Sequence, residues 1–142
     1  MEDATLTAVL AVHNSFYTAL SLADAALMER LWAPSPDAVC EHPGWPTLTG
    51  HADIQESWRG IFENQGVVHV WPTEVQVRLY GQTAEINCIE NIDLAKTRGA
   101  RRGQARATNI LRRVGADWKF LEHHAVGLPD SGPAPREPFS TN

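Results

Sequence analysis

Three polar residues suited to acid–base chemistry fall on strand-like segments in the second half of the chain. Glu90, Asn109 and Glu122 each belong to an alternating set whose other members are mostly apolar. If hairpins centred on the intervening glycine-containing loops join these strands, Glu90 lies opposite Asn109, and Asn109 lies opposite Glu122. The three side chains would form a row across the inner face of the sheet, with His124 one step further along. A β-bulge in any of these strands would shift the register by one residue.

Such a row would place two carboxylates a few ångströms apart in apolar surroundings. Both cannot ionise cheaply there, so one should keep its proton with a raised pKa. A proton-holding acid beside a carboxylate base is what isomerisation or dehydration needs. We therefore predict Glu90, Glu122 and His124 as catalytic residues and Asn109 as a ligand-binding residue. Alternatively, Glu90 and Glu122 lie at strand ends in water, or Asn109 and nearby histidines satisfy their hydrogen bonds.

The histidines suggest further ligand contacts but no metal site. His13 and Tyr17 lie on the apolar stripe of the first predicted helix, and we include both among the ligand-binding residues. A lone helical histidine can equally be a hydrogen-bonded core residue. His123 and His124 must point to opposite faces of their strand, and we expect His124 to face inward because two aromatic residues share its face. No H-x-H or H-x-x-x-H pair is present, so we predict neither a metal site nor a cofactor.

The elements that must position these residues follow from apolar periodicity. Spacing of three and four residues predicts helices over 4–21, 24–32 and 51–64. A short strand is expected between the second and third helices, over 38–42. After Gly66 the period changes to two, which predicts an antiparallel meander over 74–79, 84–93, 104–114 and 117–126. Three helices followed by a meander indicate an α+β fold in which the helices cover one face of the sheet.

Length, charge and composition exclude several classes of protein. The 142 residues suit one domain over 1–128, followed by a Pro-rich flexible tail over 129–142. A net charge of −5 argues against nucleic-acid binding, and the basic run at 96–103 suits a solvated hairpin tip. No run approaches the roughly 20 apolar residues of a membrane helix, and the N-terminus is acidic, so we expect a cytoplasmic protein. Cys40 and Cys88 suit buried free thiols.

Three segments together resemble the SnoaL-like branch of the nuclear transport factor 2-like (cystatin-like α+β) superfamily. They are "FYTAL", "CEHPGWPTLTGHADIQESW" and "ATNILRRVGADWKFLEHHAVG", and the resemblance covers roughly 5–128. The last strand is also similar to that of the association domain of calcium/calmodulin-dependent protein kinase II. In the subfamily, the position of Glu122 is usually histidine and that of His124 is often glutamine, so this chain departs at both.

The resemblance implies a cone-shaped curved antiparallel sheet wrapped around the long N-terminal helix, with a pocket at the open end of the cone. It also implies a homodimer formed through the outer face of the sheet. Some members are isomerases, dehydratases or cyclases that use acid–base chemistry in the pocket, and others are binding or assembly modules. The fold alone does not choose among these functions.

The segment "CEHPGWPTLTGH" is stiff, because Pro43 and Pro46 fix their own φ and restrict the residues before them. It connects the first strand to the third helix, at the open end of the cone that the resemblance implies. His42 and Trp45 would then be rim groups that contact an entering ligand, and we include Trp58 with them among the ligand-binding residues. Alternatively, Trp45 and Trp58 plug the end of the core, and His42 caps a backbone carbonyl.

Three functions are compatible with these residues. The first is a homodimeric binding module whose cone holds a small, largely apolar ligand. The second is an acid–base enzyme, namely an isomerase, dehydratase or cyclase. The third is a passive dimerisation module whose cone is filled by aromatic side chains. Convergent polar groups with a raised carboxyl pKa would favour the enzyme, whereas internally paired polar groups around an apolar pocket would favour the binding module.

Overall fold

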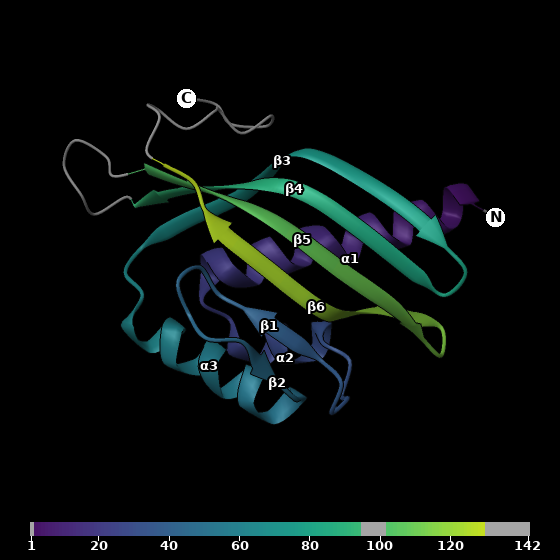
Figure 1. The fold of residues 1–142 in the computed structure, drawn as a ribbon, viewed down its shortest axis with the longest axis horizontal. Coiled ribbons are helices and arrows are strands. Elements are labelled where there is room, and N and C mark those ends of the chain that lie inside the picture. The colour runs from purple at the N-terminus through teal and green to yellow at the C-terminus, as the bar shows by residue number, and fades with distance from the viewer. Residues whose placement is uncertain (1, 95–101, 130–142) are drawn as a thin grey trace.

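The computed structural model describes residues 2–94 and 102–129 of the chain (Figure 1). Its three helices are α1 (Glu2–Leu22), α2 (Ala25–Leu31) and α3 (His51–Asn64). Its strands are β1 (Val39–Glu41), β2 (Leu48–Thr49), β3 (Val68–Tyr80), β4 (Thr83–Leu94), β5 (Arg102–Val114) and β6 (Asp117–Gly127). The hairpin tip expected at 96–103 lies mostly outside the described residues, as does the tail after Pro129.

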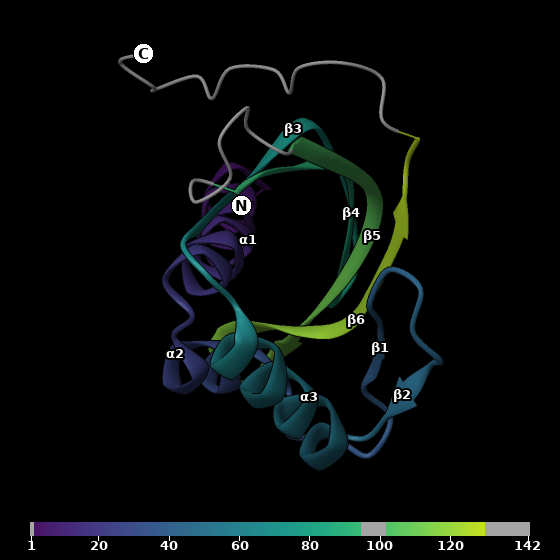
Figure 2. The same cartoon turned by 90° about the vertical axis from the view of Figure 1, so that its left-hand side faces the viewer.

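One mixed sheet contains all six described strands, in the order β2-β1-β6-β5-β4-β3. The four long strands form the antiparallel meander that the alternating pattern predicts. The short strand β1 adds to β6 in parallel, and β2 pairs with β1. End-on, β3 to β6 trace an open arc with α1 on its concave side and α2 and α3 below (Figure 2). The α+β prediction, with three helices and a strongly curved sheet, is therefore confirmed.

The core forms where α1 lies inside the arc. Phe16 on α1 stacks on Phe120 of β6, with ring centroids 4.4 Å apart, and meets Trp58 of α3 edge-on at 5.6 Å. Burial of each such aromatic side chain stabilises the fold by roughly 1.5–3 kcal/mol. Phe16 thus joins the first helix to the last strand and to α3, which fixes the distance between the sheet and both helices.

Local signals set the helix boundaries around α2 and α3. Asp24 caps α2 by accepting a hydrogen bond from the backbone N–H of Leu27 at 3.0 Å. Trp32 is extended, so α2 ends before the prolines that follow. Gly50 precedes α3 with φ +96°, a conformation that L side chains rarely adopt. These residues determine where α2 begins and ends and where α3 begins.

The strand register differs from the predicted one, and this corrects the expected row of polar residues. Glu90 pairs with Ala105, and Asn109 pairs with Ile86 and with His123. The predicted pairing of Asn109 with Glu122 is wrong because the register shifts between Ile110 and Leu111, where β6 contains an extra residue, Leu121. This bulge reverses which side of the sheet the following residues face.

Candidate functional site

Five polar side chains from four elements meet inside the cone, and we call them the buried network. They are His13 and Tyr17 of α1, Glu90 of β4, Asn109 of β5 and His123 of β6, and each residue is at most 5% exposed. Tyr17 follows His13 by four residues, which places both on one face of α1. The three strand residues all point to the concave face of the sheet. Four of the five are among the site residues predicted from the sequence, and His123 is not.

Asn109 is the centre of the buried network. Its Nδ2 donates to Nε2 of His13 at 3.0 Å and to the Tyr17 hydroxyl at 3.1 Å. Its Oδ1 accepts a hydrogen bond from Nδ1 of His123 at 2.6 Å. The Tyr17 hydroxyl in turn donates to Oε2 of Glu90 at 2.8 Å. One amide therefore orients both imidazoles and, through Tyr17, the carboxyl group.

These hydrogen bonds fix the tautomers of both histidines. Because an amide nitrogen can only donate, Nε2 of His13 must carry the lone pair, and the ring hydrogen is on Nδ1. Because an amide oxygen can only accept, His123 carries its hydrogen on Nδ1, which leaves Nε2 as the acceptor atom. That acceptor lies 4.0 Å from Oε2 of Glu90. The Nδ1 atom of His13 is buried and has no hydrogen-bond partner in the described part of the chain.

Burial determines the protonation of the network. It raises the pKa of Glu90 to about 7, although the hydrogen bond from Tyr17 favours the charged form. It lowers the pKa of His123 to about 3 and that of His13 to about 4. Burial and the charge of Glu90 raise the pKa of Tyr17 well above its usual value, so the phenol remains a donor. The approach of His123 to Glu90 is therefore not an ion pair at neutral pH.

The pKa values decide which group could transfer a proton. A general acid or base works best when its pKa lies near the working pH. The pKa of Glu90, about 7, meets this condition, whereas that of His123, about 3, makes its imidazole a weak base. Glu90 is thus the group suited to moving a proton, and His123 and Tyr17 are suited to orienting it.

A rigid loop between β1 and β2 borders the open end of the cone. His42, Pro43, Gly44 and Trp45 form a turn in which the N–H of Trp45 donates to the carbonyl of His42 at 2.9 Å, with Gly44 at φ +79°. Proline followed by a glycine of positive φ is typical of a type II turn. The ring of His42 packs edge-on against Trp58 at 4.5 Å, and burial lowers its pKa to about 4.

The two tryptophans among the predicted ligand-binding residues have different positions. Trp58 is 2% exposed and packs on Phe16 and His123, so it covers the buried network. Trp45 is 46% exposed and packs edge-on against His42. Trp45 therefore lies at the rim and does not plug the core beside Trp58.

A cavity of about 720 Å³ opens beside Trp45, and we call it the mouth cavity. It has the size of a small-molecule site. Its apolar lining comes from α1, the rim loop, α3, β3 and β4, namely Leu20, Trp45, Ile61, Val68, Val70 and Ile92.

The buried network lies one layer below the mouth cavity. Glu90 precedes Ile92 by two residues on the same face of β4, which puts it about 7 Å further into the cone. Tyr17 precedes Leu20 by nearly one helical turn, about 4.5 Å along α1. Residues that line the mouth cavity are thus close neighbours, along β4 and α1, of polar groups in the buried network.

Two predicted catalytic residues, Glu122 and His124, lie on the outer face of the sheet. His124 contacts Glu41 of β1 through Nδ1 at 2.5 Å and Glu122 through Nε2 at 2.8 Å. The expectation that His124 faces inward is wrong, because the bulge at Leu121 turns His123 inward instead. The signal that could have revealed this is Leu121 itself, an apolar residue out of phase with the aromatic residues before it.

Three further expectations concern metal ligands, membrane-spanning helices and the cysteines. Among residues 2–94 and 102–129, no group of three or more His, Cys, Asp or Glu side chains is arranged to hold a metal ion. Within the same ranges, no helix has the length and apolar character needed to cross a membrane. Cys40 and Cys88 are buried free thiols.

Solved structures from bacteria share this fold. A candidate dehydratase of the nuclear transport factor 2-like family from Streptomyces avermitilis is 29% identical, with a TM-score of 0.83, and the match covers 90% of this chain and 99% of that one. A candidate calcium/calmodulin-dependent protein kinase type II association domain from Thiobacillus denitrificans is 25% identical, with a TM-score of 0.76 and coverage of 83% and 93%.

A nuclear transport factor 2-like protein of unknown function from Pseudomonas putida shares the fold at 17% identity, with a TM-score of 0.81 and coverage of 92% and 98%. No curated protein matches the chain. The model of the SnoaL-like domain matches residues 9–129, which include all the elements from most of α1 to β6. The chain therefore belongs to the SnoaL-like domain family of the nuclear transport factor 2-like superfamily.

Proposed function

We propose that this protein binds a small, largely apolar molecule in the mouth cavity. The observation that carries the proposal is a cavity of about 720 Å³ whose lining is mainly apolar and whose rim carries a half-exposed tryptophan. An apolar ligand would gain roughly 25 cal/mol for each Å² of apolar surface removed from water. Apolar sites of this size with a few polar groups nearby are typical of small-molecule binding.

Internal pairing of the buried network supports a binding role. Asn109 bonds one nitrogen of each imidazole and the Tyr17 hydroxyl, so these atoms keep their hydrogen bonds without a ligand. A ligand in the mouth cavity would meet the apolar layer first. Glu90 would become the nearest ionisable group below a ligand that reaches past Ile92.

Gly60 allows a direct test of the mouth cavity. It lines the cavity, and a Cβ built on it would meet no atom within 4 Å. Gly60→Trp should therefore fill the cavity without disturbing the core, and we expect it to weaken binding of the uncharged fluorescent probe N-phenyl-1-naphthylamine at least tenfold.

Gly60→Ala is the matched control. It adds little volume, should bind the probe as the wild type does, and should stabilise α3 by about 1 kcal/mol through helix propensity. Equal binding of the probe by the Gly60→Trp variant and the wild type would contradict the proposal. Fluorescence titration measures both affinities, and urea unfolding checks the fold of each variant.

The second candidate function is acid–base catalysis on a ligand in the same cavity. It is favoured by one observation, the buried carboxyl group of Glu90 with a pKa of about 7 beside Tyr17 and His123. The relative at 29% identity is described as a candidate dehydratase. Dehydration, like isomerisation, uses acid–base chemistry. Glu122 and His124 take no part in this candidate, because they lie on the outer face.

Deuterium exchange at the carbon beside a ketone would test this candidate. We expect the protein to accelerate exchange of the α-protons of 2-tetralone in D₂O, with a rate that rises as pH increases through about 7. Glu90→Gln should abolish the acceleration while the mouth cavity still binds N-phenyl-1-naphthylamine. If the Glu90→Gln variant exchanges protons as fast as the wild type, Glu90 is not the base.

We also propose that the protein forms a homodimer through the outer face of the sheet. The family resemblance implies this arrangement, and the relative at 25% identity is described as a candidate association domain. Thr108 lies on the outer face of β5, where its hydroxyl donates to Asn87 at 2.8 Å. Thr108→Arg should shift the sedimentation coefficient from that of a dimer to that of a monomer. A wild-type protein that sediments as a monomer would contradict the proposal.

A further inference from the structure

Two hydrogen-bond acceptors of the buried network face each other with no donor between them. They are Oε2 of Glu90 and Nε2 of His123, which lie 4.0 Å apart, too far for a direct hydrogen bond. Nε2 of His123 carries a lone pair, because the ring hydrogen is on Nδ1, where Asn109 accepts it. A nitrogen atom placed between the two acceptors would lie about 2.9 Å from both, which is the usual length of such a hydrogen bond.

Neither acceptor group is completely sealed off. The side chains of Glu90 and His123 keep 6% and 3% of their accessible surface, whereas Nδ1 of His13 is enclosed. The second carboxyl oxygen of Glu90, Oε1, has no hydrogen-bond partner among the described residues, since Tyr17 donates to Oε2. The carboxyl group therefore has capacity for a further donor.

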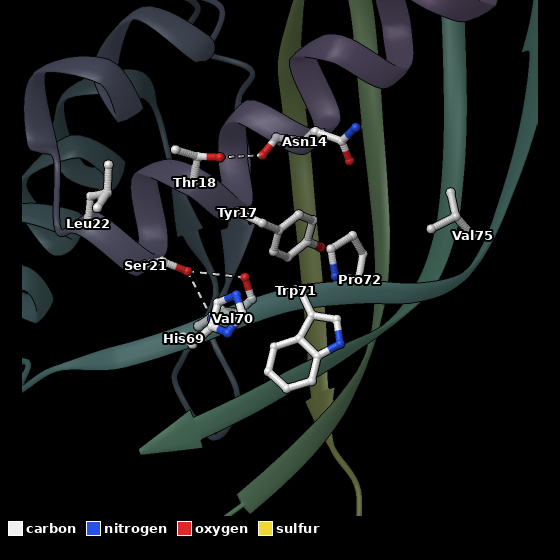
Figure 3. Close-up of a pocket in the computed structure, with 10 residues that line it drawn as sticks. All are labelled: Asn14, Tyr17, Thr18, Ser21, Leu22, His69, Val70, Trp71, Pro72 and Val75. Carbon is white, nitrogen blue, oxygen red and sulfur yellow. Dashed lines mark hydrogen bonds between the residues drawn. The ribbon is translucent and has the colours of Figure 1, made fainter. Parts of the chain in front are cut away.

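Tyr17 and Pro72 close the network on the side of β3. The Tyr17 hydroxyl donates to Glu90, and Pro72 pairs with Glu90 across β3 and β4. Both residues also line a separate cavity of about 400 Å³ between α1 and β3, where Figure 3 shows Tyr17 extending from α1 toward β3. Because they stand between Glu90 and that cavity, the approach to Glu90 that we consider is the one from the mouth cavity, past Ile92.

The surroundings of Glu90 favour a positively charged donor. Burial lowers the pKa of His123 to about 3, so at neutral pH Glu90 has no cationic partner in the described part of the chain. A buried carboxylate is costly unless it is paired or hydrogen-bonded. None of the described residues that line the mouth cavity is charged, so a cation there meets no like charge. An ammonium group supplies both the charge and the donors.

We propose that the ligand of the mouth cavity is an apolar primary amine, whose ammonium group lies between Glu90 and His123 and donates to the carboxylate and to Nε2. The inference rests on the proposed binding function and names its ligand class. The apolar body lies in the mouth cavity, and a stem of about four carbons spans the roughly 7 Å between Ile92 and Glu90 along β4. A hydroxyl group, with one hydrogen, donates to only one of the two acceptors.

Proton release accompanies binding where Glu90 is protonated. The O–H bond of the carboxyl group breaks as the ammonium group binds, and the proton passes to the solvent. The other titratable groups around Glu90 are His13, Tyr17, Cys40, Cys88 and His123. Burial lowers the pKa of each histidine and raises the pKa of the phenol and of each thiol. Glu90, with a pKa of about 7, is thus the member of this group that titrates between pH 6 and pH 8.

The test compares three matched probes on the full chain by isothermal titration calorimetry at pH 8. 4-Phenylbutylamine is the primary amine, 4-phenyl-1-butanol is its neutral counterpart, and N,N-dimethyl-4-phenylbutylamine keeps the charge with a single N–H. We expect the primary amine to bind at least tenfold more tightly than the alcohol and at least threefold more tightly than the dimethylamine.

The pH dependence of the same affinities is a second readout. A proton on Glu90 competes with the ammonium group, so the affinity for 4-phenylbutylamine should rise about tenfold from pH 6 to pH 8. The affinity for the alcohol should change by less than twofold. Titrations at pH 6 in buffers of different ionisation enthalpy should show the release of about one proton for each amine bound.

Two variants assign the effect to Glu90. Glu90→Gln keeps an oxygen atom for the Tyr17 hydroxyl but removes the negative charge. We expect this variant to bind 4-phenylbutylamine at least tenfold more weakly, without the pH dependence, and N-phenyl-1-naphthylamine as the wild type does. Glu122→Gln makes the same chemical change on the outer face of the sheet. It is the matched control and should keep the wild-type affinity for the amine.

The outcomes separate this inference from the proposed function. Equal affinities for the amine and the alcohol would overturn the inference, while binding of N-phenyl-1-naphthylamine would still support the mouth cavity as a site. Wild-type amine affinity in the Glu90→Gln variant would overturn the inference as well. A protein that binds neither N-phenyl-1-naphthylamine nor any of the three probes would contradict both.

Discussion

His123 and His124 are adjacent in the sequence, yet their environments are opposite. His123 is 2% exposed, and burial lowers its pKa to about 3. His124 lies between two carboxylates on the outer face; partial burial acts to lower its pKa, but the hydrogen bonds with Glu122 and Glu41 outweigh this and raise it. The comparison shows that the face of the sheet, and not the residue type, determines the direction in which the pKa of each imidazole shifts.

The number of bonded ring nitrogens explains the difference in charge. Both nitrogens of His124 contact carboxylate oxygens, and the protonated ring, with a hydrogen on each nitrogen, can donate to both, which is why these contacts raise its pKa. On the inner face, His123 donates from one nitrogen to a neutral amide and keeps a lone pair on the other. The inner region is a network of neutral groups around Asn109, whereas the outer region is an exposed ion-pair cluster.

The largest expected effect comes from removing the centre of the inner region. Asn109→Leu leaves His13 and His123 without their polar partners in a buried site, and each such loss costs about 1–3 kcal/mol. We expect the free energy of unfolding to fall by about 4 kcal/mol in urea titrations. Thr108→Val, which removes one hydrogen bond on the outer face at the neighbouring position, should lower it by about 1 kcal/mol or less. Equal losses in the two variants would show that Asn109 does not organise the core.

The second largest expected effect is a dependence of the unfolding free energy on pH, caused by Glu90. Its pKa in the folded protein, about 7, is higher than the usual value of 4.5, so the folded state binds more protons between these pH values. Stability should therefore fall as pH rises through that range, by about 1.4 kcal/mol per pH unit and about 3 kcal/mol in all. The Glu90→Gln variant should lose this dependence of the unfolding free energy on pH, while the dependence caused by the histidines should remain.

The difference in unfolding free energy between the wild type and the Glu90→Gln variant, followed from pH 4 to pH 8, measures the Glu90 contribution alone. We expect the wild type to lose stability relative to the variant across this range. A constant difference would mean that the pKa of Glu90 is the same in the folded and the unfolded protein. That result would also remove the basis for acid–base catalysis by Glu90.

The smallest expected effect on stability comes from His124 and its two carboxylate partners on the outer face. Because the pKa of His124 is raised above its usual value of 6.5, its stabilising contribution is fully present below pH 6.5. This contribution should be lost as pH rises through the folded-state pKa. His124→Gln should remove the slope, which should also vanish in 1 M NaCl because salt screens exposed charges. A slope unaffected by salt would indicate that the cluster is less exposed than its side chains suggest.

Much of the fold could be predicted from the sequence, because it depends on periodicity. The third helix was predicted with its observed bounds, 51–64, and the alternating segments predict all four long strands. The strand β1 was expected, but its parallel pairing with β6 was not. Three residues carry no information about a partner so distant in the chain, and apolar spacing does not distinguish a parallel pair from an antiparallel one.

Only part of the candidate site could be predicted from the sequence, because prediction again depended on periodicity. Alternation placed Glu90 and Asn109 on the inner face, and helical spacing placed His13 and Tyr17 there, all of which the structure shows. His123 was missed because one extra residue in β6 inverts the alternation after Phe120. Bulges depend on the curvature of the finished sheet, so local sequence patterns specify them weakly.

The parallel pair of β1 and β6 constrains when this protein can fold. β1 belongs to the first third of the chain and β6 to its end, and Phe16 of α1 stacks on Phe120 of β6. During synthesis, the ribosome therefore releases α1 and β1 long before β6 exists. The parts of α1 and β1 that contact β6 stay without this partner until it emerges, and contacts so distant in sequence form slowly. We expect the nascent N-terminal half to remain available to chaperones until β6 has been synthesised.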